Sequence, residues 1–364
     1  MNALNEDEQD MTSTTYTERP LLTIAIPTYN RSRYLREFLE ALLPQIESAN
    51  DVELLISDNA SPDDTAEMLA EVLPVGGRFR VVRQAENIGS DANFCFCYRQ
   101  ATGKYFWLCG DDDILRPGTM AALLPPLRQA EFDMVYVVPE AFYQDWRTEH
   151  QPDPYGRGAE VVTSARLMML NMHTSMAFIT AVIVNRDRVE TLMKDPPEAF
   201  KGTALLQLSW ILPLFQGHRQ SLVLWQRFVA ARSMNSNFDA AEIFGRSLQK
   251  VGRTLLTERP DLARMLTNYT LRQWFPPMLM DMRLHQGAND GYGLPKAEKT
   301  LRELFRFNPL FWLFVYPALK VPLGQRGLLA RCLMLANQVI NFVSEPAEGM
   351  HKLRLKRAQQ SSSV

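Results

Sequence analysis

The sequence has little excess charge of either sign. Its 39 basic and 41 acidic residues leave a net charge of −2, so no overall basic field would attract nucleic acid. Cysteine is scarce too, and the spacing of Cys95, Cys97, Cys109 and Cys332 matches no metal-binding pattern. Such cysteine usage fits a reducing compartment, and we expect a cytoplasmic protein without a nucleic-acid partner.

Long apolar runs are also missing. Residues 1–19 are polar and acidic without the apolar stretch of a secretory signal, and we expect a disordered tail there. The apolar run 309–319 holds 11 residues, whereas a membrane-spanning helix needs about 20. With 46% hydrophobic and 22% charged residues, the chain has the composition of a globular protein. Its 364 residues suit one large domain with an appendage.

Short apolar strands alternate with amphipathic helices in the first half of the chain. Strands are predicted over 21–28, 51–58, 78–84, 104–110 and 132–138, with helices over 32–46, from 62, over 90–103 and over 116–130. We expect the last of these helices to be interrupted by Pro125 and Pro126. The alternation predicts an α/β fold with a mainly parallel sheet and helices on both faces.

Polar clusters follow four of these strands. They are Thr28-Tyr29-Asn30-Arg31, Ser57-Asp58-Asn59, Asn87-Ile88-Gly89-Ser90-Asp91 and Asp111-Asp112-Asp113. Ligands of such sheets bind outside the carboxyl ends of the strands. We therefore expect these four clusters to meet at one rim of the sheet and to form a binding site.

The acidic triplet has two interpretations. Adjacent carboxylates about 6 Å apart repel by roughly 3 kcal/mol at an effective dielectric constant near 20, a cost that water or a divalent cation can offset. An isolated acidic triplet is usually a solvated turn. Here an apolar strand precedes it at the rim, which favours Mg²⁺ or Mn²⁺ held by one or two carboxylates and by substrate phosphates.

Two other rim residues leave alternatives open. Asp58 could accept a hydrogen bond from a pyrimidine base, or it could cap the turn at 59–62. Ser90 and Asp91 suit the first turn of a helix, but plain helix capping does not explain Asn87.

The segments IPTYNR, ISDNASPDDT, ENIGSDANF and GKYFWLCGDDDIL, in this order and spacing, resemble the family 2 glycosyltransferases with the GT-A fold. The abequosyltransferase-like branch, which acts on bacterial O-antigen precursors, is the most similar. The resemblance covers about residues 20–140. It implies a catalytic domain over 20–245, a nucleoside-diphosphate sugar as donor, and Mg²⁺ or Mn²⁺ as cofactor.

The resemblance also implies roles for single residues. Thr28, Tyr29, Asn30, Arg31, Asp58, Asn87 and Asp91 would line the nucleotide-sugar pocket. Asp113 would be the principal metal ligand, Asp111 would lie near the metal and the ribose, and Asp112 would lie near the donor sugar. Arg232, Asn235 and Ser236 would form a segment that closes over the diphosphate, although the same residues could form an ordinary turn.

The family's general base is the weakest part of this prediction. Inverting members often use a carboxylate in a Glu-Asp pair, and the matching segment, residues 195–215, contains no such pair. Glu198 and His173 are the alternatives that the sequence offers, and a histidine beside apolar residues is more often structural.

In residues 246–364 the alternation of strands and helices stops, and this region is predicted to be helical. Leu, Phe and Trp interspersed with Arg and Lys over 305–357 favour contact with a membrane surface. Packing on the catalytic domain or on a second copy is the alternative.

The resemblance implies sugar transfer, with inversion, to a hydroxyl of a glycan on a polyprenyl-diphosphate carrier at the inner face of the cytoplasmic membrane. One rival is a sugar nucleotidyltransferase, which would favour a glycine-rich loop that IPTYNRSRYL lacks. The other is a non-catalytic scaffold at the membrane.

Overall fold

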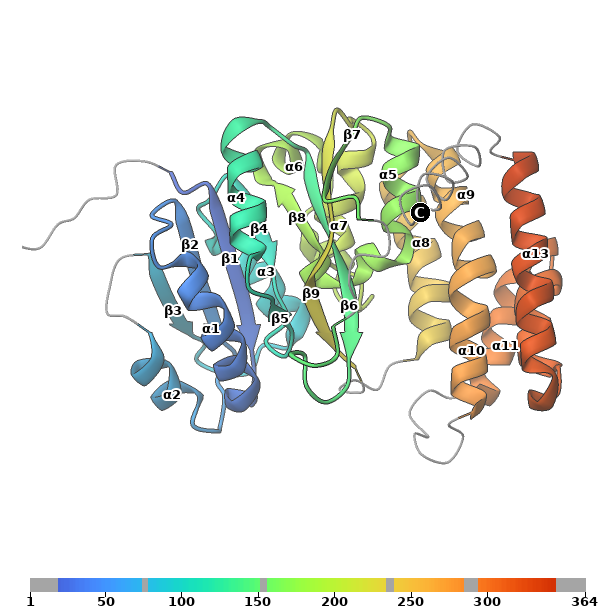
Figure 1. Cartoon of the computed structure of the whole chain (residues 1–364), viewed down its shortest axis with the longest axis horizontal. Helices are drawn as coiled ribbons and strands as arrows, with labels where there is room; N and C mark the ends of the chain where they lie inside the picture. The colour runs from blue at the N-terminus through green and yellow to red at the C-terminus, as the bar shows by residue number, and fades with distance from the viewer. Residues whose placement is uncertain (1–18, 74–77, 151–155, 234–238, 285–293, 345–364) are drawn as a thin grey trace, which may run out of the picture.

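The computed structural model describes residues 19–73, 78–150, 156–233, 239–284 and 294–344. These residues form a nine-stranded sheet with helices on both faces and a layer of helices at one end (Figure 1). The strand order is β3-β2-β1-β4-β8-β6-β9-β5, and β7 pairs with β9 outside this path. The α/β class predicted from the sequence is confirmed.

One half of the sheet is parallel, as the alternating pattern predicts. It consists of β1 (Leu22–Thr28), β2 (Val52–Asp58), β3 (Phe79–Arg83) and β4 (Tyr105–Leu108). Every residue of β1, β2 and β4 is buried, which is why these strands are apolar on both faces. Parallel pairing brings their carboxyl ends to one edge of the sheet.

The other half is mixed, which corrects the expectation of a mainly parallel sheet. It contains β5 (Ile114–Leu115), β6 (Met134–Phe142), β7 (Ala159–Val162), β8 (Val182–Asn185) and β9 (Ser221–Arg232). β8 lies between β4 and β6 and is antiparallel to both. The fifth predicted strand, β6, is thus not beside β4, and its parallel neighbour is β9.

Helices cover both faces because successive strand residues point to opposite sides. In β1, Ile24 and Ile26 pack with α1 (Ser32–Ile46), α2 (Thr65–Val72) and α4 (Thr119–Gln129). Ala25 belongs to the opposite core, which contains residues of α3 (Ser90–Gln100), α5 (Ala165–Met172), α6 (Arg186–Leu192) and α7 (Leu208–Ile211). Short 3-10 segments join these elements at η1 (His173–Ala177), η2 (Ile179–Ala181), η3 (Pro197–Phe200) and η4 (Leu212–Phe215).

Helix α4 continues through both of its prolines, contrary to the expected interruption. It runs without a break from Thr119 to Gln129. Leu123, Leu124 and Leu127 are buried in the core beneath it. Tertiary packing therefore outweighs the backbone hydrogen bonds that Pro125 and Pro126 cannot donate.

The remaining described residues are mainly helical. They form the π-helical segments η5 (Ala241–Ser247), η6 (Thr270–Trp274) and η8 (Phe311–Val315), the 3-10 turn η9 (Leu323–Gln325), and helices α8 (Leu248–Leu255), α9 (Pro260–Tyr269), α10 (Phe275–Leu284), α11 (Leu294–Phe305), α12 (Tyr316–Lys320) and α13 (Arg326–Ser344).

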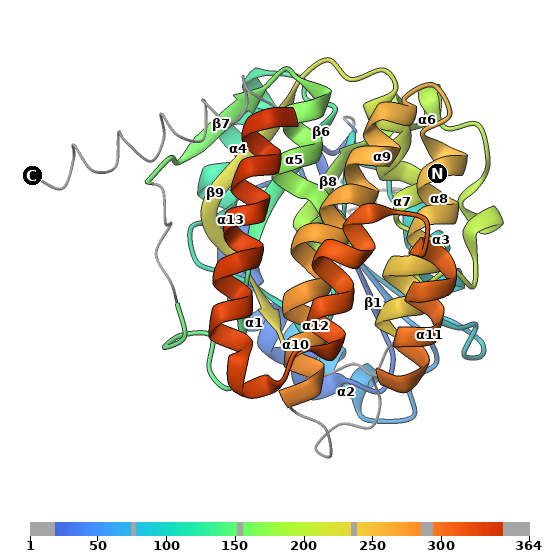
Figure 2. The same cartoon turned by 90° about the vertical axis from the view of Figure 1, so that its right-hand side faces the viewer.

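These C-terminal helices fall into two layers. Leucines of α8 and α9 pack into the core on the α3 side of the sheet. Helices α10, α11 and α12 share a separate core that includes Phe275, Leu301 and Phe311. α11, α12 and α13 lie beside one another on the face shown in Figure 2. Among the described residues, none of the helices combines the length and apolarity that a bilayer crossing requires.

Candidate functional site

The four polar clusters predicted to converge do meet, in a pocket at the carboxyl ends of β1, β2 and β4. Its volume is about 430 Å³, within the range of small-molecule sites. The lining residues are Pro27, Thr28, Tyr29, Arg31, Asn59, Asn87, Gly89, Ser90, Asn93, Phe94, Gly110, Asp111, Asp112 and Ile179. Every cluster contributes at least two of them except the one after β2, which contributes Asn59. We call this cavity the rim pocket.

Two carboxylates of the acidic triplet face the rim pocket. Thr28 Oγ1 donates a hydrogen bond of 2.7 Å to Asp111 Oδ2. Arg31 Nη1 lies 3.0 Å from Asp111 Oδ1 and also 3.0 Å from Asp112 Oδ2. The Arg31 side chain is 37% exposed, so its positive charge bridges the two carboxylates at the mouth of the pocket.

Asp113 lies behind the pocket wall. Its Oδ2 accepts a 2.5 Å hydrogen bond from the hydroxyl of Thr180, and its Oδ1 accepts one of 3.3 Å from the Arg232 backbone N–H. The same Thr180 hydroxyl accepts a 2.9 Å hydrogen bond from Gly110 N–H. A Cβ atom at Gly110 would lie 2.8 Å from Asp113 Oδ2, so a larger residue here would force the Asp113 carboxylate to move.

Burial disfavours the charged forms of two carboxyl groups in the acidic turn. Burial raises the pKa of Asp111 to about 6; the charge of Asp112 adds to the rise, while Arg31 and Thr28 act against it. Burial, followed by the charge of Asp112, raises the pKa of Asp113 well above its ordinary value, although Thr180 lowers it. Both directions mean that a further positive charge here would be stabilising.

The acidic turn therefore suits a divalent cation that is bound only partly by the protein. Carboxylate oxygens are suitable ligands, and a cation beside them would favour the charged forms of Asp111 and Asp113. In the described part of the chain, no group of three or more His, Cys, Asp and Glu side chains is arranged to hold a metal ion. The arrangement thus suits a cation bound by one or two carboxylates and completed by a ligand's oxygens, rather than a closed protein site.

Two asparagines shape the opposite wall of the rim pocket. Asn59 Nδ2 donates 2.9 Å to Asn87 Oδ1, and Asn59 Oδ1 accepts 2.9 Å from Ile88 N–H. Asn87 Oδ1 also accepts from Gly89 N–H at 2.9 Å. Gly89 has a φ of 83° and precedes α3, so the N-terminus of this 11-residue helix opens into the pocket.

Asp58 adopts the turn-capping role that the sequence left as one of two alternatives. Its Oδ1 accepts from Ser61 N–H at 2.9 Å, and its Oδ2 lies 2.8 Å from Arg83 Nη1. Asp58 is 1% exposed and is not among the residues that line the rim pocket. Asn59, which the sequence analysis placed in the same cluster without a role of its own, lines the pocket in its place.

The two predicted alternatives for a general base lie outside the lining of the rim pocket. Glu198 Oε1 is 2.7 Å from Arg99 Nη2. Burial would raise the Glu198 pKa, but hydrogen bonds from its backbone and Cys95 and the charge of Arg99 lower it overall. The ring of His173 stacks on Tyr269 with centroids 4.1 Å apart, and its Nδ1 accepts from Ser175 N–H at 3.4 Å.

Asp91 and Arg232 connect the pocket to later parts of the chain. Asp91 Oδ2 accepts a 2.6 Å hydrogen bond from Gly202 N–H. Arg232 Nε donates to the Asp112 carbonyl at 3.1 Å, and its Nη2 lies 2.5 Å from Glu37 Oε2. Arg232 therefore supports the acidic turn from behind. Asn30 has a φ of 55° in the β1–α1 turn. Asn235 and Ser236 lie outside the described residues.

Sequence reasoning missed Thr180, Glu37, Phe94 and Ile179. Thr180 lies in an apolar run before β8, where no motif marks it, and only the antiparallel pairing of β8 with β4 brings it to the triplet. Phe94 and Ile179 contribute apolar surface to the pocket. The sequence pattern does not show whether an apolar residue of a helix or strand packs in the core or lines a ligand site.

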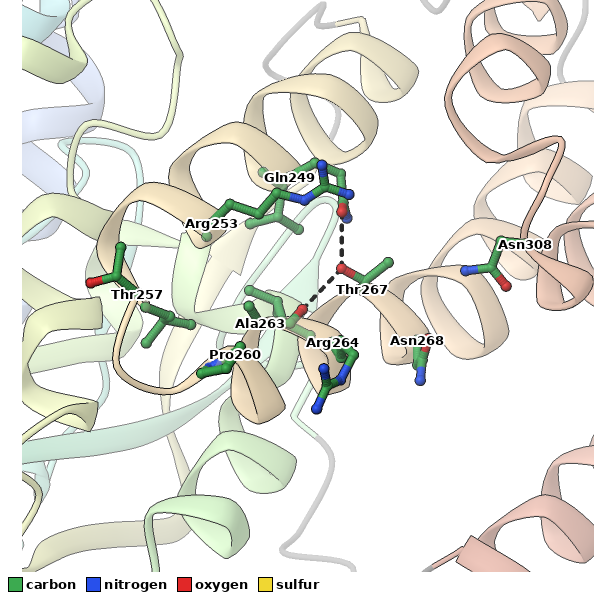
Figure 3. Close-up of a pocket in the computed structure, with 13 residues that line it drawn as sticks. Gln249, Arg253, Thr257, Pro260, Ala263, Arg264, Thr267, Asn268 and Asn308 are labelled. Atoms are coloured by element: carbon green, nitrogen blue, oxygen red, sulfur yellow. Dashed lines mark hydrogen bonds between the residues drawn. The ribbon is translucent and has the colours of Figure 1, made fainter.

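A larger cavity lies between α8 and α9, away from the acidic turn (Figure 3). It has a volume of about 560 Å³ and is lined by residues that include Arg253, Arg264 and Asn268. Inside it, Thr267 Oγ1 lies 3.0 Å from Gln249 Oε1 and 2.9 Å from the Ala263 carbonyl oxygen, either of which can accept its proton. No carboxylate lines this cavity, so its chemistry favours it less as the reaction site than the smaller rim pocket.

Comparison with known proteins gives matches to the sheet half of the chain. Residues 23–192 match the family model described as glycosyl transferase family 2. Over 105 residues the chain is 40% identical to abequosyltransferase RfbV of Salmonella typhimurium, covering 28% of this chain and 31% of the relative. Over 106 residues it is 27% identical to the GalNAc(5)-diNAcBac-PP-undecaprenol beta-1,3-glucosyltransferase of Campylobacter jejuni, covering 29% and 34% respectively. The chain thus matches about a third of the length of these relatives.

The likeness to solved structures extends further along the chain. The structure of S. aureus TarS 1–349 in complex with UDP-GlcNAc aligns with a TM-score of 0.56 at 14% identity, covering 89% of this chain and 92% of that chain. The same fragment without a named ligand aligns with a TM-score of 0.54. At such low identity the likeness concerns the fold, and the GT-A fold predicted from the sequence is confirmed.

Proposed function

We propose that the chain, of which residues 23–192 match the model of glycosyl transferase family 2, transfers a sugar from a nucleoside-diphosphate sugar to a hydroxyl of a bacterial glycan. One observation carries the proposal. The polar clusters after β1, β2, β3 and β4 line a single pocket, and the acidic turn forms one wall of it.

The rim pocket suits a nucleotide sugar by its chemistry. Tyr29 is 41% exposed and offers a ring face to a base or a sugar. Asn59, Asn87 and Ser90 offer donors and acceptors for hydroxyl groups, and the N-terminus of α3 favours negative charge. The complex of TarS with UDP-GlcNAc supports a donor of this class.

A divalent cation, Mg²⁺ or Mn²⁺, fits the wall made by Asp111 and Asp112. These two carboxylates line the rim pocket, so we propose that they hold it, with Asp113 supporting the turn from behind. Asp113, the principal ligand implied by the family resemblance, is not among the residues that line the rim pocket. When bound, the cation would stabilise the negative charge of the departing diphosphate.

The chain's own groups would orient the reactants. Arg31 places a positive charge beside the acidic turn, where it can also pair with phosphate oxygens. In the transfer, the bond from the anomeric carbon to the diphosphate breaks and a bond to the acceptor oxygen forms. The acceptor's hydroxyl proton must pass to a base.

Of the three predicted catalytic residues, Asp112, Glu198 and His173, we propose that Asp112 lies beside the reacting sugar. Its carboxylate lines the pocket, and its side chain is 17% exposed. Glu198 is bound to Arg99, and its lowered pKa makes it a weaker base. His173 is engaged with Tyr269 and Ser175. Inversion at the anomeric carbon stays a proposal from the family resemblance.

We propose a lipid-linked glycan as the acceptor, at the inner face of the cytoplasmic membrane. The name of the Campylobacter relative states an acceptor linked to undecaprenol through a diphosphate. We further propose, from the sequence, that copies of this chain associate into a homo-oligomer.

A non-catalytic binding subunit is the second candidate, because no Glu-Asp pair occurs in the segment 195–215. The intact acidic turn at the rim pocket favours the enzyme. Sugar nucleotidyl transfer is disfavoured by the absence of glycine from the turn after β1.

The experiment is a thermal-shift screen of UDP, CDP, GDP and dTDP, each with and without Mn²⁺, followed by an assay of donor hydrolysis. At a ligand concentration of 100 Kd, the native state gains about 2.7 kcal/mol. We expect one nucleotide to raise the melting temperature, and more so with Mn²⁺. Binding without any turnover of the matching nucleotide sugars would favour the scaffold, and no shift with any nucleotide would refute the donor site.

A further inference from the structure

Helix α13 leaves most of its apolar surface uncovered. Over residues 326–340 only Leu329 is buried. Leu328, Leu335 and Val339 are 66%, 62% and 63% exposed, and with the exposed Cys332 they recur at spacings of four, three and four residues. That spacing places them on one side of a helix, which we call the outer stripe of α13.

The neighbouring elements add further exposed apolar groups. Phe307 is 88% exposed, and Trp312 and Leu313 of η8 are 43% and 48% exposed. The guanidinium of Arg306 lies 4.8 Å from the Phe307 ring, and that of Arg302 lies 5.7 Å from the Trp312 ring. Helices α11 and α13 belong to the layer that lies on the far side from β1 to β4 (Figures 1 and 2).

Basic residues predominate in α13 and in the segment before it, whereas the neighbouring α11 also carries Glu298 and Glu303, and Glu298 Oε2 lies 2.7 Å from Lys320 Nζ. Residues 305–344 contain four basic residues, Arg306, Lys320, Arg326 and Arg331, and no acidic residue, although the whole chain has a net charge of −2. The sequence continues with Glu345 and Glu348 and then with Lys352, Arg354, Lys356 and Arg357. An apolar stripe beside basic side chains and exposed aromatic rings matches the chemistry of an anionic lipid surface, with its acyl interior and negative headgroups.

We propose that the outer stripe of α13, with the basic residues beside it, docks the protein on an anionic bilayer surface. A second copy of the chain fits less well, because α13 carries Arg326 and Arg331 and no carboxylate to pair with them. Two such helices would bring like charges together. The inference rests on the proposed lipid-linked acceptor, since docking would hold the enzyme where that acceptor lies.

The test is flotation of the full-length chain with vesicles of phosphatidylglycerol and phosphatidylcholine, and with vesicles of phosphatidylcholine alone. We expect binding to the anionic vesicles that weakens with salt. The double variant Leu335→Ser/Val339→Ser should bind about tenfold more weakly, because two inserted apolar side chains are lost. The matched control Gln338→Ser alters an exposed polar residue of the same helix and should bind like the wild type.

Nucleotide-induced thermal shifts, measured on the same variants, separate this inference from the proposed function. All variants should keep the wild-type shift, because α13 contributes no residue to the rim pocket. Failure to float with anionic vesicles, or equal flotation of the double variant, overturns the docking surface while a normal nucleotide shift leaves the donor site standing. A wild-type dimer that the double variant loses, with flotation unchanged, would assign the stripe to a second copy.

Discussion

The hydroxyl of Thr180 is predicted to hold the acidic turn in place. Thr180 is 0% exposed, donates to Asp113 Oδ2 at 2.5 Å and accepts from Gly110 N–H at 2.9 Å. The substitution Thr180→Val keeps the shape of the side chain and removes both hydrogen bonds. Each buried group left without a partner costs about 1–3 kcal/mol, so we expect a loss of roughly 4 kcal/mol in the free energy of unfolding.

The matched control is Thr180→Ser, which keeps the hydroxyl and removes one methyl group. A buried methyl group is worth about 1 kcal/mol, so the serine variant should be more stable than the valine variant by roughly 3 kcal/mol. Urea unfolding monitored by tryptophan fluorescence measures both values. Trp107 reports on this region because its Nε1 donates to the Thr180 carbonyl at 2.9 Å.

The two variants should also differ in nucleotide binding. Thr180 does not line the rim pocket, so its side chain can affect a ligand only through Asp113 and Gly110. We expect Thr180→Val to weaken the Mn²⁺-dependent thermal shift and Thr180→Ser to preserve it. A valine variant at least as stable as the serine variant would refute the assignment of these hydrogen bonds.

Three further predictions concern the site and its support. Gly110→Ala should abolish Mn²⁺-dependent nucleotide binding in calorimetry, because the new Cβ would lie 2.8 Å from Asp113 Oδ2; unchanged binding would contradict the close approach. Glu198→Gln should leave nucleotide binding and donor hydrolysis within about twofold of wild type, since Glu198 is bound to Arg99; a hundredfold loss of turnover alone would instead make it the base. Burial raises the pKa of Glu53, but hydrogen bonds from Thr23, Arg80 and Thr102 outweigh it and lower this pKa overall. Glu53→Gln should therefore cost about 2 kcal/mol in unfolding experiments at neutral pH. That difference should shrink as the pH falls through the lowered pKa, and a difference that stays constant into acid would contradict it.

The parallel half of the sheet could be predicted because its determinants are local. β1, β2 and β4 are short and largely apolar runs that end in polar residues, and the helices between the strands have their own apolar spacing. The rule that ligands bind at the carboxyl ends of parallel strands then placed four clusters at one pocket, as observed.

The other half depends on pairing between distant segments, which local patterns do not reveal. No local pattern shows that β8 lies between β4 and β6. This position of β8 brings Thr180 next to Asp113. The pattern of apolar and polar residues also does not predict the orientation of single side chains. Asp58 and Asn59 are adjacent, yet their side chains point in different directions. Asp58 accepts a hydrogen bond within the turn, whereas Asn59 lines the pocket.

The most direct test of the account is calorimetric titration of the selected nucleoside diphosphate, with and without Mn²⁺, into the wild type and Asp112→Asn. Glu67→Gln is the control, because it removes an exposed carboxylate on α2 outside the rim pocket. We predict that Mn²⁺ strengthens binding about tenfold or more in the wild type and in the control, and that it has no effect in Asp112→Asn. An equal effect of Mn²⁺ in all three proteins, or binding that ignores Mn²⁺ throughout, would contradict a cation held at the acidic turn.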